Sequence, residues 1–533
     1  MQTQSNPATK NESALNDSAV SLDALQYSGE FIDRHIGPSK VQIEQMLQVL
    51  NLESLDALIA STVPEAIALK SPLELDGPLT ESAALAKLKA IAEQNGTAKS
   101  FIGLGYYDTF TPNVILRNVL ENPSWYTAYT PYQPEISQGR LECLLNFQQM
   151  TLDLTAMDLA NASLLDEATA AAEAMSLAKR VSKNRAANKF FVDRQCLPQT
   201  IDVIKTRAEC FGFELVIGDI NDADLSELFG AIFQYPAVTG EARDLTEVIS
   251  QLHEHKAIAI VAADLMSLTL LKPPGEMGAD VVTGTTQRFG VPMGYGGPHA
   301  AYFATKEDYK RAVPGRIIGV SVDKRGRQAF RMALQTREQH IRREKANSNI
   351  CTAQVLLANI SALYAMYHGP KGLKNIAQRI HRLTSIMATG LQSAGIEIVN
   401  ENFFDTLTLK VDAGDIAAIL DRAKMNKINL RIDRVEQDQS IGISLDECSS
   451  SKDVENIWRI ILGNAAQKLS AADIDAQIVS GEKAAVIPDN LIRHSKYLQH
   501  HNFNSYHSET EMMRYLKKLE DKDISLTHSM IAL

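Results

Sequence analysis

The sequence predicts an α/β protein with a mostly parallel central sheet, followed by a smaller α+β domain. Between residues 139 and 304, short runs rich in β-branched and aromatic residues alternate with segments of helical length. The runs are KFFV, FELVIG, GAIFQYP, AIAIVAA, DVVTG and AAYFA. This alternation is typical of βαβ units, in which the strands are parallel and the crossovers are right-handed.

Composition and charge narrow the class of protein. The chain has 533 residues, of which 45% are hydrophobic and 22% charged, as expected for a globular protein of about three domains. The net charge of −11 argues against a nucleic-acid or anionic-membrane partner. The five cysteines have neither CxxC nor zinc spacing, so we expect reduced thiols and no metal site. Without an apolar run of membrane length or a signal peptide, the sequence indicates a cytoplasmic protein.

The chain divides into five predicted regions. Residues 1–30 form a flexible polar tail, and residues 31–96 form a helical region with the amphipathic segment VQIEQMLQVLN. Residues 97–350 make the large α/β domain, with helices expected at 139–157 and 165–180. Residues 351–465 make the small domain, with two successive helices and then strands and helices around an antiparallel sheet. Residues 466–533 are expected to be a linker that leads into the truncated start of another domain.

Residues 101–142 are unusually rich in tyrosine, glycine and proline. Gly103 and Gly105 permit tight turns, and Thr111 or Asn113 is expected to cap the helix of NVILRNVLE. The prolines of YTAYTPYQPE exclude a helix there. Two interpretations stay open for the tyrosines at 106, 107, 129 and 132: they line a pocket, or they seal the core beneath a long loop.

Asp264 and Gln287 follow two of the predicted strands, at the sheet edge where parallel sheets bind ligands. In pyridoxal-phosphate enzymes of the aspartate aminotransferase fold (fold type I), an Asp at such a position pairs with the pyridinium nitrogen. A Lys roughly twenty to forty residues later forms the Schiff base. Here Lys272 comes too soon after Asp264, and Gln287 stands where the lysine is expected. A glutamine cannot form an imine.

The predicted helix that begins near Ser163 offers a second test for this cofactor. A phosphate needs open N–H groups at a helix N-terminus. Here Asp166 and Glu167 already supply negative charge, and Ser163 with Asp166 has capping-box spacing. We therefore expect a capped helix that repels a phosphate by about 1–4 kcal/mol per carboxylate.

Two further segments carry candidate residues. The glycine-rich turn at 290–299 precedes a strand, so it is not a dinucleotide fingerprint. Its His299 is either a proton donor or a structural histidine. Residues 316–352 are rich in arginine and form either an interface for an acidic group or a solvated helix; we favour the interface because ANSNICTA carries small polar residues.

Several motifs together resemble the P-protein of the glycine cleavage system, glycine dehydrogenase (decarboxylating). They are DRHIGPS, GLGYYDTFTPNVILRN, AYTPYQPEISQGRLE, QRFGVPMGYGGPHAAYFA, TREQHIRREKANSNICTAQ and HNFNSYHSETEMMRYLKKLE. That family consists of two homologous halves, on one chain or two, with the cofactor lysine in the second. The sequence is similar to the amino-terminal half plus the opening of the second.

The resemblance implies decarboxylation of glycine with pyridoxal phosphate and transfer of the aminomethyl group to the lipoyl group of H-protein. It implies that the lysine-bearing half holds the cofactor, while this chain contributes loops to the mouth of the site. Residues 337–342 would act as a scaffold. The site-lining candidates are Tyr106, Tyr107, Tyr132, Gln133 and His299.

Two functional hypotheses follow. In the first, the chain is the lysine-free half of a glycine decarboxylase and is inactive without the other half. In the second, it is a truncated, inactive fold-type-I module that acts only as a partner-binding fragment. The end of the chain favours truncation, and we expect the apolar face of residues 509–519 and Ile531–Leu533 to be uncovered and to drive association.

Overall fold

The computed structural model describes residues 21–25, 29–127, 129–294, 296–334, 339–350, 354–435, 438–482, 487–525 and 527–528. The chain forms two compact units, Met1–Thr97 and Ala98–Leu533. The first unit is helical where it is described. Its helices are α1 Leu22–Leu25, α2 Glu30–His35, α3 Lys40–Leu50, α4 Leu55–Thr62 and α5 Glu81–Ala92. Within the described residues, no helix is both long and apolar enough to cross a membrane.

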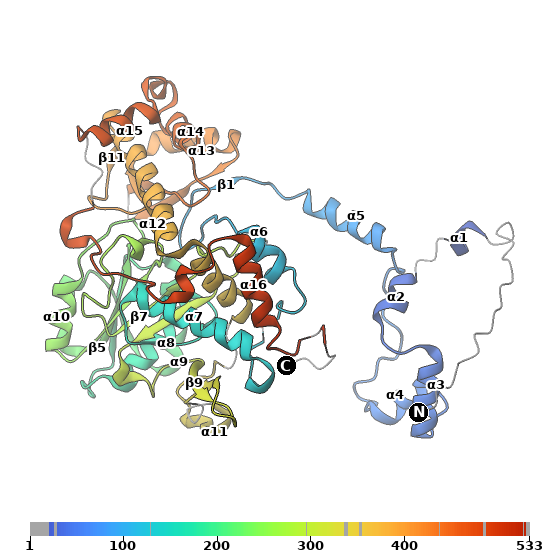
Figure 1. The fold of residues 1–533 in the computed structure, drawn as a ribbon. Helices are drawn as coiled ribbons and strands as arrows, with labels where there is room; N and C mark the ends of the chain where they lie inside the picture. The colour runs from blue at the N-terminus through green and yellow to red at the C-terminus, as the bar shows by residue number, and fades with distance from the viewer. Residues whose placement is uncertain are drawn as a thin grey trace. The chain divides into compact units, whose positions relative to one another are not determined.

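The second unit is built on a central sheet that follows the predicted alternation (Figure 1). Its strand order is β2, β8, β7, β6, β5, β3, β4. The bounds in that order are Leu159–Ala160, Ala301–Thr305, Val281–Thr285, Ile258–Ala263, Leu228–Tyr235, Lys189–Asp193 and Glu214–Gly218. The strands from β7 to β4 pair in parallel, while β8 pairs antiparallel with both β7 and β2. All the predicted strands are therefore present, and the prediction of a mostly parallel sheet is confirmed.

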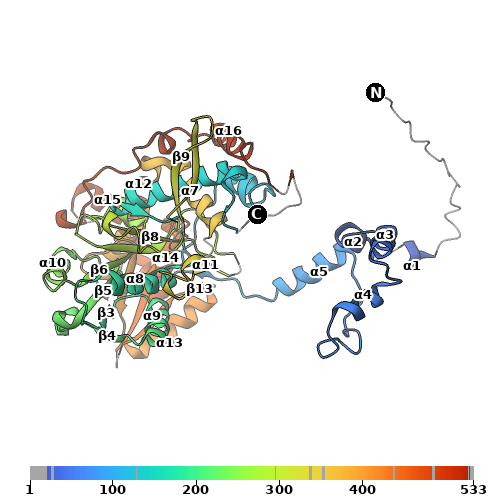
Figure 2. The ribbon, with the colours of Figure 1, turned by 90° about the horizontal axis from the view of Figure 1, so that it is seen from below.

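Helices cover both faces of this sheet (Figure 2). The helices that pack on the sheet are α7 Gln138–Thr155, α8 Glu167–Val181, α9 Pro198–Phe211 and α10 Thr246–Glu254. Strand alternation sorts side chains between the faces: Ile258 and Ile260 pack in the cluster with α8 and α9, whereas Ala259 and Val261 pack in the cluster with α7 and α10. The sheet is thus buried on both sides, which explains its continuous apolar runs.

The small domain follows a long helix, α12 Val355–Ser393. Gly369 has non-helical dihedrals (φ 62°, ψ 177°) just before Pro370, so α12 is two helices joined at a break, as predicted. An antiparallel sheet comes next, in the order β11, β12, β15, β14, with bounds Glu397–Ile398, Thr406–Lys410, Asp438–Ser444 and Arg431–Val435. Its helices are α13 Ala413–Met425, α14 Ser451–Leu462 and α15 Ala471–Ser480. The short strands β1 Lys99–Ser100 and β13 Ile428–Asn429 pair in parallel.

The predicted side-chain cap of one helix was wrong, and the helix alternative does not describe the first part of the Arg-rich segment. The helix of NVILRNVLE begins after Pro112 as α6 Asn113–Ile115 and continues as a π-helix, Leu116–Leu120, without a side-chain cap. Thr111 instead donates its hydroxyl to the carbonyl of Gly290, 2.7 Å away. The Arg-rich segment from residue 316 begins as an antiparallel hairpin, β9 Ile317–Val322 and β10 Gln328–Ala333, before the short helix α11 Gln339–Arg342.

The expectation of an uncovered face on residues 509–519 was also wrong. Helix α16 Glu509–Glu520 buries Met512, Tyr515, Leu516 and Leu519. It lies against α7, where a Cβ on Gly139 would come within 2.1 Å of the Leu519 carbonyl oxygen. The capping box of Ser508 and Glu511 defines where the helix begins. Its apolar face is therefore covered by this chain itself, while Ile531–Leu533 lie outside the described residues.

Candidate functional site

The carboxyl edge of the central sheet carries a buried ion cluster. Asp264 follows β6 and Arg288 follows β7, so the parallel pairing brings both to one edge. Arg288 donates from Nη1 to Oδ2 of Asp264 at 2.7 Å, and it also contacts Oδ2 of Asp405 from the small domain. The side chains of Arg288 and Asp405 are each only 4% exposed. One guanidinium therefore links the two domains through two carboxylates.

The charges in this cluster do not balance. Burial lowers the pKa of Arg288, but Asp264 and Asp405 raise it by more, so the guanidinium stays charged. Two carboxylates facing one cation leave a net negative charge in a buried place. Burial accordingly raises the pKa of Asp264, and the charge of Asp405 adds to the rise despite the opposing effect of Arg288.

Tyr107 covers the cluster. Its ring centroid lies 3.8 Å from the Arg288 guanidinium carbon, a stacked cation–π contact. Gln287 holds the backbone of Tyr107: its Oε1 accepts from the Tyr107 N–H at 3.1 Å, and its Nε2 donates to the Tyr107 carbonyl at 2.7 Å. Nε2 also donates to the Val291 carbonyl at 2.8 Å. The Gln287 side-chain amide thus pairs with the N–H and the carbonyl of Tyr107, as the backbone of a neighbouring β-strand would.

The segment around Tyr107 is fixed along its length. Gly103 and Gly105 have φ of +71° and +88°, which favour glycine, and a Cβ on Gly103 would lie 2.1 Å from Ser444 Oγ. Thr109 donates its hydroxyl to the Arg288 carbonyl at 2.9 Å. The Asp108 N–H donates to Asp446 Oδ2 at 3.0 Å. This aromatic segment is an ordered part of the site, built against residues 287–290.

The N-terminus of α8 lies beside this cluster and is closed. Asp166, not Ser163, is its N-cap, in a capping box with Thr169; Ser163 has φ +93° and its hydroxyl accepts from the Gln354 N–H. The prediction of a capped helix is confirmed, but its cap lies one turn later than expected. Glu167 accepts from Gln234 Nε2 at 3.1 Å, and burial raises its pKa to about 7.

A comparison with known proteins identifies the family to which this chain belongs. The family description "Glycine cleavage system P-protein" matches residues 33–461. The chain belongs to the P-protein family. It is 61% identical over 513 residues to the glycine dehydrogenase (decarboxylating) of Stutzerimonas stutzeri (strain A1501), covering 96% of this chain and 52% of that protein. It is 58% identical over 518 residues to the enzyme of Idiomarina loihiensis, covering 97% and 53%.

Solved structures agree with this assignment. A crystal structure of glycine decarboxylase (P-protein) of the glycine cleavage system, in inhibitor-bound form, superposes with a TM-score of 0.72 at 31% identity, covering 80% of this chain and 98% of that one. Glutamate decarboxylase of Lactobacillus brevis matches in fold alone, with a TM-score of 0.55 at 11% identity over 78% of this chain and 98% of that one. The fold is pyridoxal-phosphate fold type I, as predicted. The chain spans about half the length of the curated relatives it matches.

The residues at this P-protein edge do not fit pyridoxal phosphate. The amide of Gln287, which cannot form an imine, is already hydrogen-bonded to the carbonyls of Tyr107 and Val291. Arg288 already supplies the cation for Asp264. A cavity of about 30 Å³ remains among Tyr107, Glu167 and Asp264, space for about one water molecule.

The predicted site-lining residues lie in two places. Tyr106, which is 41% exposed, meets His299 edge to face at 4.6 Å and lies over Gly297, next to the segment of Tyr107. Tyr132 instead accepts from Arg316 Nη2 at 3.0 Å, and exposed Gln133 follows it. Of the proposed scaffold, residues 337 and 338 lie outside the described residues.

Sequence reasoning missed Arg288 and Asp405. The signal for Arg288 was its place directly after Gln287, at the same sheet edge as Asp264, because a buried carboxylate needs a partner. Asp405 gave no comparable signal. It comes from another domain, 117 residues along the chain from Arg288.

Proposed function

We propose that this chain is the lysine-free half of a glycine decarboxylase. A lysine-bearing half, on the same chain or as a second subunit, holds pyridoxal phosphate, which supplies the electron sink for loss of carbon dioxide from glycine. Lipoylated H-protein accepts the aminomethyl group. The assembly is cytoplasmic, and this chain alone does not turn over glycine.

The observation that carries this proposal is the position of Arg288 between Asp264 and Asp405. In a P-protein relative that covers about half of the curated lengths, the edge that should hold the cofactor is filled by the protein's own cation. Such a half retains the fold, while the lysine-bearing half carries out the reaction. What it contributes is a rigid surface beside the site.

The Tyr106–His299 pair is the best candidate for that surface. His299 is 9% exposed, and neither of its ring nitrogens has a hydrogen-bond partner among the described residues. A buried polar group without a partner costs about 1–3 kcal/mol. Burial lowers the pKa of His299, which keeps the ring neutral, with one donor and one acceptor to offer. A group presented by the other half would satisfy it.

Reconstitution tests the proposal. The part of the Stutzerimonas stutzeri relative that this chain does not match is produced separately and mixed with the chain, pyridoxal phosphate and lipoylated H-protein. We expect glycine-dependent exchange of labelled bicarbonate from the mixture and none from either piece. If the pieces bind and never turn over, the chain is an inactive partner-binding module and the proposal is wrong.

A pair of variants tests the surface within that assay. Tyr106→Ala should lower the exchange rate at least tenfold, because an ordered aromatic at the mouth of a site positions the substrate. Tyr126→Ala is the matched control, since Tyr126 has a similar exposure, 48% against 41% for Tyr106. Circular dichroism measures the folded fraction of both. Equal losses for the two variants would assign Tyr106 to packing.

A further inference from the structure

The β9–β10 hairpin projects from the large domain (Figure 2). At its root, Ile318 and Met332 are opposite each other and buried. Further out the same face carries Val320 opposite Phe330, and then Val322. Val320 and Val322 are 62% and 68% exposed. An apolar stripe therefore runs from the core to the tip of the hairpin and is covered only at its root by the described residues.

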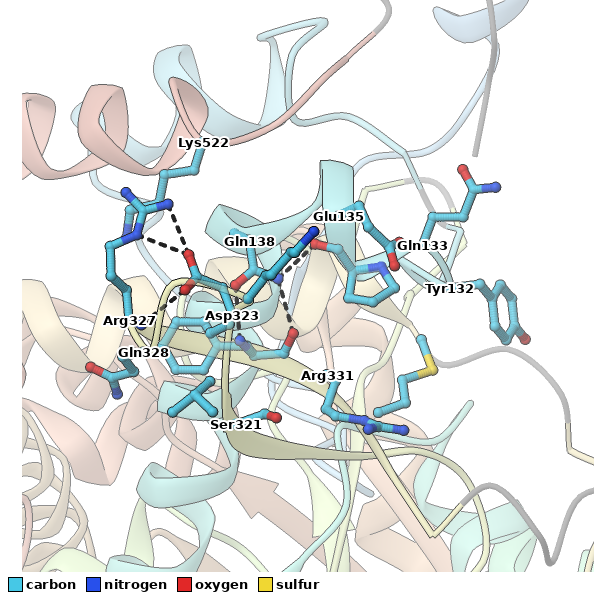
Figure 3. A pocket seen from close by; sticks show the side chains of 16 residues that line it. Tyr132, Gln133, Glu135, Gln138, Ser321, Asp323, Arg327, Gln328, Arg331 and Lys522 are labelled. Atoms are coloured by element: carbon cyan, nitrogen blue, oxygen red, sulfur yellow. Dashed lines mark hydrogen bonds and ion pairs between the residues drawn. The ribbon is translucent and has the colours of Figure 1, made fainter.

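Glutamine side chains bond the outward backbone groups of one residue on each strand of the hairpin. Gln148 accepts from the Ile318 N–H at 2.7 Å and donates to the Ile318 carbonyl at 3.1 Å. Gln138 does the same for Phe330 on the opposite edge, at 2.8 and 2.9 Å (Figure 3). Because polar groups alternate along a strand, the N–H and carbonyl of Val320 and Val322 point the same way as those of Ile318.

The outer part of β9 is therefore an open strand edge. Among the described residues, no hydrogen bond reaches the outward amides of Val320 and Val322. On the other side, a groove of about 1060 Å³ separates the hairpin from the turn at Pro134–Ile136 (Figure 3). Natural proteins usually cover or interrupt such an edge, because it pairs readily with another strand.

The tip of the hairpin is cationic. It carries Lys324, Arg325 and Arg327, with Asp323 paired to Arg327 at 2.8 Å, and Arg331 adds a charge nearer the root, opposite Gly319. This local excess of positive charge stands in a chain of net charge −11. Charge complementarity favours an acidic partner segment.

We propose that the open edge of β9 binds the lysine-bearing half by strand addition, a proposal that rests on the proposed function. An extended acidic segment of that half continues the pairing where Gln148 ends and covers the valine stripe. Exposed valines suit a permanent partner, because obligate interfaces are more apolar than transient ones. A carrier protein that must dissociate in each cycle fits this surface less well.

The position of the hairpin agrees with this assignment. The carbonyl of Arg316, at its root, accepts from the Ala162 N–H at 2.7 Å, and two residues later the Leu164 N–H donates to the Ala301 carbonyl at 2.9 Å. Ala301 begins β8, just after His299. The segment at 162–164 thus joins the hairpin root to the strand that follows His299, so a half bound to the Tyr106–His299 pair can reach the hairpin.

Two variants test the edge. Val320→Lys with Val322→Lys places charges in the stripe, and Val322→Pro removes one outward N–H without removing a ladder hydrogen bond. We expect each to weaken binding of the separately produced lysine-bearing half at least tenfold by sedimentation. Met425→Lys is the control, because Met425 is 83% exposed at the end of α13. Hydrogen exchange of the wild-type pair should slow at residues 319–323.

The outcomes separate this proposal from the proposed function. If the wild-type chain does not bind the lysine-bearing half at all, both the proposed function and the docking site are wrong. If the wild-type pair binds and exchanges bicarbonate, but the β9 variants bind as Met425→Lys does, only the docking site is wrong. Loss of H-protein binding or of self-association in the variants, with binding of the half unchanged, would overturn it equally.

Discussion

Arg288 Nη1 lies 2.7 Å from Oδ2 of Asp264, so the carboxylate that ends β6 already has its cation inside the chain. Asp405 holds the same guanidinium from the small domain, and the Tyr107 ring covers it. The carboxylate at the predicted cofactor position has become part of an interdomain ion cluster. This arrangement explains how the buried carboxylates of Asp264 and Asp405 are both paired with a cation.

Removing the Arg288 guanidinium should lower the stability of the fold. Arg288→Met leaves two carboxylates buried without their cation, and we expect a loss of about 3–5 kcal/mol in the free energy of unfolding, measured with urea. The triple variant Arg288→Met, Asp264→Asn, Asp405→Asn removes the stranded charges and should recover part of that loss. No difference between the single and triple variants would show that the charges are not what matters.

Restoring a lysine should not restore cofactor binding. Gln287→Lys breaks the amide contacts with Tyr107 and leaves Arg288 and the 30 Å³ cavity in place. After incubation with pyridoxal phosphate and reduction by borohydride, we expect no adduct at residue 287 by mass spectrometry, nor any site-specific adduct in the wild-type chain. A stoichiometric adduct at position 287 of the Gln287→Lys variant would contradict the view that the site is filled.

Glu167 should make stability depend on pH. Its folded pKa is raised to about 7 from an ordinary value of 4.5, so the folded state binds the proton more tightly than the unfolded state does. Its contribution to stability is complete below pH 4.5 and is lost as the pH rises through 7. Glu167→Gln should therefore be more stable than wild type at pH 8, by on the order of 3 kcal/mol, and similar to it near pH 4.5. A difference that does not vary with pH would argue against a raised pKa.

Gly103 should tolerate no side chain. In Gly103→Ala the methyl group meets Ser444 Oγ, and alanine must adopt φ +71°. We expect a loss of about 2–5 kcal/mol in the free energy of unfolding from strain and overpacking together. Gly414→Ala is the control: no atom lies within 4 Å of its added Cβ and it is helical, so the change should be neutral or stabilising by up to ~1 kcal/mol.

Much of the fold was readable from local patterns. Strands such as Ile258–Ala263 are continuous apolar runs because both of their faces are buried, and the break before Pro370 divides α12 as predicted. The glutamine at position 287 was equally readable, because it follows a recognisable strand. Periodicity, proline geometry and side-chain chemistry are properties of short segments, so the sequence alone determined them.

Tertiary structure decided what fills the site and what covers each surface. Arg288 and Asp405 meet across a domain boundary, and α16 finds its cover on α7, far away in the chain. The two short strands of the hairpin after Arg316 pair across a charged turn, and Gln138 and Gln148 of α7 bond their outward edges. These contacts join residues more than a hundred positions apart, and no local pattern encodes such a distance. The sequence therefore determined that residue 287 is a glutamine, and only the folded structure decided that Arg288 pairs with Asp264.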